Sequence, residues 1–65
     1  MKLTMLQDTL NSKNELQAAK GEKVDLISDH HFPVLLIQGK SGRTLSVRYT
    51  GTDYDPKIMK PNENT

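Results

Sequence analysis

The segment 32–50 constrains the fold most, because two strand-like patterns flank a short polar loop. Residues 32–38 form a nearly continuous run of apolar, mostly branched side chains, which is typical of a central strand covered on both faces. Residues 39–42 read Gly-Lys-Ser-Gly, a loop of the length that joins hairpin strands. Residues 44–50 then alternate between polar and apolar, which predicts a strand with one wet face. The segment therefore predicts a β-hairpin.

A third strand is predicted just before this hairpin. Val24 and Leu26 alternate with polar Asp25, and the sequence Asp-His-His at 29–31 has turn character. Pro33 lacks an N–H group, so it belongs at the first position of the next strand or at a bulge. Together with the hairpin, this strand would complete a three-stranded antiparallel β-meander.

The N-terminal third carries a helical pattern. Leu3, Leu6 and Leu10 recur at helical spacing, and the sequence Ser-Lys-Asn-Glu at 12–15 fits a capping box that starts a second helix. Leu16, Ala18 and Ala19 continue that helix to Gly21, a suitable residue beyond a helix C-terminus. The two apolar stripes would face opposite sides of a single straight helix, so two short helices, about 3–10 and 13–20, are expected. The alternation from Met1 to Met5 leaves an initial short strand as the other interpretation.

The expected fold class is therefore α+β, with two short N-terminal helices packed on the three-stranded antiparallel β-meander. The alternative is a small SH3-like β-barrel with an N-terminal helix, which needs about five strands. Residues 1–59 would form one small α+β domain, with Tyr54, Ile58 and Met59 closing one edge of its core. Residues 60–65 are polar and contain a proline, which predicts a flexible C-terminal tail.

Size and composition limit how such a domain can be stabilised. A chain of 65 residues has room for one domain and buries only about 60% of its unfolded surface. It has no cysteine, which removes disulfides and the usual structural zinc sites. Chains of this size often gain stability from a partner subunit, so self-association, most simply as a homodimer, is expected.

No targeting or membrane signal is apparent in the sequence. The longest apolar run, residues 34–37, is far shorter than the roughly 20 residues of a membrane span. The N-terminal residues lead into no apolar core of a signal peptide. The protein is therefore expected to be cytoplasmic and not to bind membranes.

Motifs that would carry chemistry are incomplete. Gly39-Lys40-Ser41 resembles the end of a phosphate-binding loop, but Val34 stands where the motif needs a glycine and a strand follows instead of a helix. His30 and His31 are adjacent, so on a strand they would point to opposite faces and chelate a metal poorly. The serines lack an activating signature, and Asp53 and Asp55 lie in a turn-like segment. The sequence predicts no catalytic residue, no metal site, no cofactor and no enzymatic activity.

The apolar run suggests an interaction surface. A small sheet with two helices covers one face well, so a strand that is apolar on both faces leaves side chains without cover, and exposed apolar patches mark interfaces. The leading hypothesis is a small interaction or regulatory protein that binds a protein partner. The expected interface residues are Phe32, Val34 and Leu36.

A basic hairpin gives the alternative hypothesis. No acidic residue lies between His30 and Thr52, whereas this stretch contains three cations and His31. Cations beside hydroxyl groups on an open sheet face can bind a nucleic-acid backbone. The expected contact residues are Lys40, Arg43, Arg48 and His31. A third interpretation is a subunit that contributes a strand or a loop to a shared enzyme site.

Overall fold

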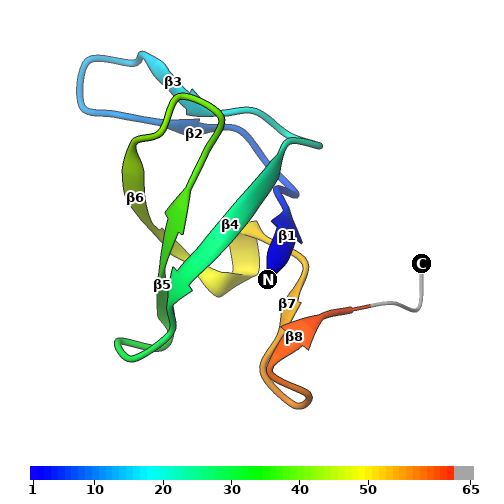
Figure 1. The fold of residues 1–65 in the computed structure, drawn as a ribbon. Helices are drawn as coiled ribbons and strands as arrows, with labels where there is room; N and C mark the ends of the chain where they lie inside the picture. The colour runs from blue at the N-terminus through cyan, green and yellow to red at the C-terminus, as the bar shows by residue number, and fades with distance from the viewer. Residues whose placement is uncertain (63–65) are drawn as a thin grey trace.

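The strands expected around residues 39–42 are present in the computed structural model, which describes residues 1–62 (Figure 1). Almost all of the regular structure is β. The elements in chain order are β1 (Lys2–Thr4), β2 (Thr9–Leu10), β3 (Leu16–Ala18), β4 (Lys23–Ser28), β5 (Val34–Gln38), β6 (Thr44–Arg48), the 3₁₀ turn η1 (Tyr49–Gly51), β7 (Tyr54–Asp55) and β8 (Lys60–Pro61).

The main sheet has four antiparallel strands in the order β1-β4-β5-β6. Strands β5 and β6 pair from Val34↔Arg48 to Gln38↔Thr44, which confirms the predicted hairpin. Strand β4 pairs with β5 and contains a bulge between Leu26 and Ser28, so the three predicted strands are adjacent and antiparallel, but they belong to a sheet of four strands and not of three. Strand β1 adds to the free side of β4.

The chain after β6 returns to the opposite edge of this sheet. Met5 forms an isolated bridge with Thr52, just beyond η1. On either side of this bridge, the Leu6 N–H donates to the Gly51 carbonyl at 2.9 Å and the Asp53 N–H donates to the Thr4 carbonyl at 3.0 Å. Because η1 continues directly from β6, these bonds bring the two ends of the sheet together into a small, partly closed barrel.

The core lies inside this curved sheet. Strand β5 has the alternation expected of a strand with two different faces, since Leu35 and Ile37 are fully buried and Val34 and Leu36 are only half-buried. Within residues 1–62 the buried hydrophobic side chains are Leu3, Met5, Ala18, Val24, Leu35, Ile37, Val47 and Tyr54.

The predicted helix over 3–10 is wrong, and so is the α+β class. Both expected architectures began with a helix, whereas residues 1–62 contain no α-helix. Leu3 and Met5 are buried while Leu6 and Leu10 are exposed, so the alternation of residues 1–5 was the correct signal. A short helix is marginal in water, whereas pairing of β1 with β4 satisfies the backbone and buries Leu3.

The predicted helix over 13–20 is also wrong. Here β2 and β3 form a two-stranded arm, and the Asn11 side chain organises the loop between them. Its Oδ1 accepts hydrogen bonds from the N–H groups of Lys13, at 2.8 Å, and Glu15, at 3.0 Å. Asn14 adopts a left-handed backbone with φ 62°. The segment around Ser12 therefore forms a turn capped by Asn11, a use of a short polar side chain that competes with helix formation.

The C-terminal part of the described chain is a second small hairpin. Strands β7 and β8 pair through Tyr54↔Pro61 and Asp55↔Lys60, and the Asn62 N–H donates to the Asp53 carbonyl at 2.8 Å. The division into a domain 1–59 and a tail 60–65 stays a prediction. Lys60 and Pro61 of the expected tail form β8. Residues 63–65 lie outside the described part of the chain. No helix within residues 1–62 has the length and apolar character needed to cross a membrane.

Candidate functional site

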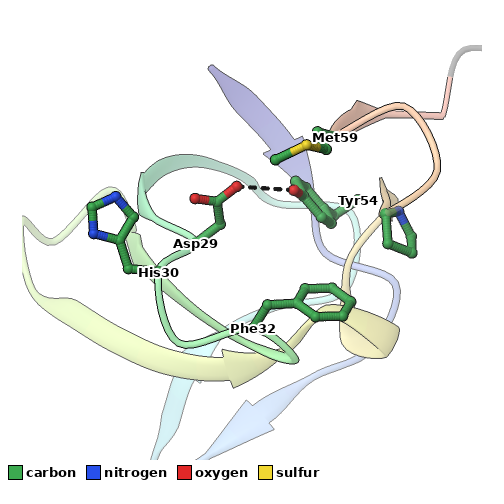
Figure 2. Close-up of a pocket in the computed structure, with 6 residues that line it drawn as sticks. Asp29, His30, Phe32, Tyr54 and Met59 are labelled. Atoms are coloured by element: carbon green, nitrogen blue, oxygen red, sulfur yellow. Dashed lines mark hydrogen bonds between the residues drawn. The ribbon is translucent and has the colours of Figure 1, made fainter.

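The candidate site is a hollow between the turn after β4 and the β7–β8 hairpin (Figure 2). Its volume is about 300 Å³. We call it the aromatic hollow. It is lined by Asp29, His30, Phe32, Tyr54, Pro56 and Met59.

Phe32 is held at the rim by other aromatic rings. Its ring stacks on that of Tyr49 with centroids 4.9 Å apart and lies 6.3 Å from the ring of Tyr54. Its backbone N–H donates to the Asp29 carbonyl at 3.1 Å, and the bond that follows, to Pro33, is cis. In spite of these contacts, Phe32 is 48% exposed. The turn therefore presents a large apolar ring that is fixed in position and open to solvent.

Asp29 and Tyr54 face each other across the floor of the aromatic hollow. The Tyr54 hydroxyl donates to Asp29 Oδ2 at 3.0 Å, as the dashed line in Figure 2 marks. Burial of the ring raises the pKa of Tyr54 above its ordinary value of 10.0, and the hydrogen bond and charge of Asp29 act in the same direction. Tyr54 is therefore protonated at neutral pH and keeps the Asp29 carboxylate in a fixed orientation.

Met59 closes the aromatic hollow from the β7–β8 turn. Its backbone N–H donates to the Asp55 carbonyl at 2.7 Å, and its backbone lies in the left-handed region with φ 56°. Glycine and asparagine adopt this conformation readily, whereas methionine does so at a cost in free energy. The side chain is also 61% exposed. The left-handed backbone would favour another residue type, and the apolar side chain lies in water. The folded chain by itself therefore does not explain a methionine at this position.

The predicted interface residues occupy two different surfaces. Phe32 lines the aromatic hollow, whereas Val34 and Leu36 line a second hollow of about 390 Å³ on the outer face of the sheet. The adjacent histidines divide in the same way, with His30 at the first hollow and His31 at the second. No group of three His, Asp or Glu side chains that could hold a metal ion occurs within residues 1–62.

The predicted basic residues do not form one cluster. Lys40 and Arg43 lie in the β5–β6 loop, whereas Arg48 pairs with Val34 at the other end of β6, roughly 15 Å of strand away. His31 lies in the turn near that second end. The Lys40 N–H donates to Glu22 Oε2 at 3.4 Å, so an acidic side chain from another segment lies beside the loop. The sequence analysis did not include this carboxylate, because Glu22 lies 18 positions before Lys40 in the chain.

Sequence reasoning missed most of the aromatic hollow. Asp29 and the segment 53–56 were interpreted only as turns, and Tyr54 and Met59 only as the edge of the core. Tyr54 is indeed buried, but Met59 is exposed. The available signal was an apolar pair, Ile58 and Met59, in an otherwise polar C-terminal segment.

Comparison with known proteins found no match. No family model, no curated protein and no solved structure matches the chain. A function for the chain is therefore inferred from the side chains of the aromatic hollow.

Proposed function

We propose that this protein acts by binding and not by catalysis, and that it binds a protein partner through the aromatic hollow. The observation that carries the proposal is the pair of exposed side chains, Phe32 and Met59, at the rim of one hollow. Aromatic residues and methionine are enriched where proteins bind each other, and rigid apolar anchors dominate such interfaces.

The backbone of Met59 supports this proposal. A residue kept in an unfavourable conformation, with its apolar side chain in water, is explained if that side chain contacts something in the bound state. Phe32 fits the same interpretation, because stacking on Tyr49 has already fixed the ring that a partner would cover. Little conformational entropy then remains to be lost on binding.

A selection from a random peptide library, displayed on phage, tests the proposal. Wild-type protein should enrich peptides that Phe32→Ser and Met59→Ser variants bind at least tenfold more weakly, about the loss expected for removing an interface anchor. Leu16→Ser on β3 is the matched control, because Leu16 is 56% exposed but lies outside the aromatic hollow. If the control weakens binding as much as the rim variants do, the aromatic hollow is not the binding site.

Self-association and a cytoplasmic location are further parts of the proposal. The second hollow, with half-buried Val34 and Leu36, offers apolar surface that a second copy could cover. A reducing compartment is consistent with a chain without cysteine.

Nucleic-acid binding by Lys40, Arg43, Arg48 and His31 is the second candidate function. The observation that favours it is the exposed face of β6, where Thr44 and Ser46 precede Arg48 without an acidic residue. Its affinity should fall linearly with salt on a logarithmic plot, and an Arg43→Glu/Arg48→Glu variant should lose it. No binding below about 100 μM at low salt would eliminate this candidate.

A further inference from the structure

The aromatic hollow carries one formal charge, and it is negative. Among the six lining residues that the described part of the chain provides, Asp29 alone carries a formal charge when histidine is counted as neutral, although the whole chain has a net charge of +1. Within residues 1–62 the ion pair joins Lys2 to Asp25, and it does not involve Asp29. Asp29 Oδ2 accepts the Tyr54 hydroxyl, whereas no hydrogen bond to Oδ1 occurs in the described part of the chain. A carboxylate oxygen is therefore left for an incoming donor.

The surroundings of this oxygen suit a flat cation. The rings of Phe32 and Tyr54 are tilted by 46° to each other, and their faces carry the partial negative charge that attracts cations. The Met59 thioether adds a polarisable wall. Figure 2 shows the Asp29 carboxylate directed toward Tyr54, while the His30 imidazole points away from the other labelled side chains. His30 therefore lines the aromatic hollow without directing its imidazole ring toward the Asp29 carboxylate.

We propose that the aromatic hollow takes the side chain of an arginine in the partner protein. This inference depends on the proposed function, because it names the ligand group of the same site. The guanidinium donates to Asp29 Oδ1 while its plane stacks on the exposed ring of Phe32. Lysine fits less well, because its ammonium is more strongly hydrated and cannot stack.

Other types of side chain fit the aromatic hollow less well than arginine does. A purely apolar group would cover Phe32 and Met59 but would also remove water from the Asp29 carboxylate without replacing it. An acidic group would place a second negative charge next to Asp29. Arginine has the apolar stem, the flat cation and the donors that the three features of the site require.

The test uses short Gly-Ser peptides that differ only in one central residue, with arginine, citrulline, norleucine or glutamate at that position. Binding to the full chain is measured from NMR shifts of the amide groups of residues 29–32, 54 and 59. Citrulline keeps the shape of arginine but has no charge. We expect the arginine peptide to bind about tenfold more tightly than the citrulline peptide, the range of a charged hydrogen bond.

Two isosteric variants make the test specific. Asp29→Asn keeps an oxygen that can accept the Tyr54 hydroxyl and should reduce the preference for arginine over citrulline to about twofold. Asp25→Asn is the matched control, since it removes a carboxylate of β4 that lies outside the aromatic hollow, and it should leave the preference unchanged. Phe32→Leu should weaken arginine binding a few-fold, because it removes the stacking surface.

The outcomes separate this inference from the proposed function. If norleucine binds as well as arginine at the same amide groups, the hollow binds apolar side chains and the arginine assignment is overturned while the proposed function stands. If no peptide shifts these amides at about 10 mM, both proposals fail for this site. If Asp25→Asn lowers the arginine preference as much as Asp29→Asn, the preference comes from overall charge and the assignment to Asp29 is overturned.

Discussion

Two side chains of the aromatic hollow, Tyr54 and Met59, contribute differently to the folded state. Tyr54 is buried and hydrogen-bonded to Asp29, so it stabilises the fold as well as shaping the site. Met59 is exposed and has a left-handed backbone, so the fold would be at least as stable without it. Removal of the Tyr54 hydroxyl and relief of the Met59 backbone should therefore change stability in opposite directions.

The stability contributed by Tyr54 should depend on pH. Its pKa is raised in the folded state, so the contribution is complete below the unfolded pKa of about 10. At higher pH the unfolded tyrosine loses its proton first, and the contribution is lost as pH rises through the folded pKa. We therefore expect wild-type stability in urea to fall more steeply above about pH 10 than that of Tyr54→Phe.

At neutral pH, Tyr54→Phe should lower the free energy of unfolding by about 1 kcal/mol, because the hydrogen bond to Asp29 is removed. If the free energy of unfolding falls equally with pH in the wild type and in Tyr54→Phe, Tyr54 does not cause the pH dependence.

Met59→Gly should raise the free energy of unfolding by about 0.5 kcal/mol. Relief of the left-handed backbone is worth roughly 1–2 kcal/mol, and part of that gain is offset by the larger entropy of glycine in the unfolded chain. Chemical denaturation monitored by circular dichroism measures this change. Met59→Ala, which keeps the backbone conformation strained, is the control and should not stabilise. A loss of stability in Met59→Gly would mean that the Met59 side chain holds the fold together.

At the scale of elements, strand β5 distinguishes the inside of the barrel from its outside. The predicted central strand was apolar on both faces, and its sequence does not say which face forms the core. The structure places Leu35 and Ile37 inside and Val34 and Leu36 outside, because β1 and the segment after η1 close the barrel on one side only. Replacing each of the two adjacent leucines, Leu35 and Leu36, with alanine therefore tests this assignment, because the two variants have the same composition.

Leu35→Ala should destabilise the protein by about 2–5 kcal/mol, since it leaves a cavity in a fully buried position. Leu36→Ala should change stability by less than about 1 kcal/mol, because this side chain is only half-buried. Urea denaturation at low temperature measures both. Equal losses in the two variants would contradict the assignment of the faces.

The β7–β8 hairpin is the element that holds the rear of the aromatic hollow. A chain that ends after Met59 loses both pairs of this hairpin and should be destabilised by about 1 kcal/mol, whereas a chain that ends after Asn62 keeps them. Thermal unfolding of the two truncated chains measures the difference. Equal melting temperatures would support the expected boundary at residue 59 and mean that β8 adds nothing to stability.

At the scale of the whole molecule, the core is small. The described part of the chain buries eight hydrophobic residues, and domains of this size are marginal. The second hollow, around Val34 and Leu36, is where additional apolar surface could be covered. This is the surface to which the expected homodimer is assigned.

Sedimentation velocity over a range of concentrations tests this assignment. Wild type should form dimers as concentration rises, and Leu36→Glu should stay monomeric, because a buried unpaired carboxylate is unfavourable. Leu16→Glu on β3 is the control and should behave as wild type. A wild-type protein that is monomeric throughout would contradict the homodimer.

The amino-acid sequence by itself determined the β4–β5–β6 meander. Its alternation, its apolar run and the loop 39–42 are local signals, and neighbouring strands in a meander pair with each other, so no distant segment is needed. The leucine spacing in residues 3–10 is also a local signal, but it wrongly predicts a helix. A pattern of three leucines fits a helix as well as a strand followed by a loop, and only the pairing of β1 with β4 decides between them.

Only the tertiary structure brings the residues of the aromatic hollow together. Asp29 and Tyr54 are 25 positions apart in the chain, and they meet because closure of the barrel returns β7 to the turn that follows β4. Each is an ordinary turn or core residue in its own segment. A site made by contact between distant segments leaves no periodic signal in either, so the sequence encodes its parts while the fold brings them together.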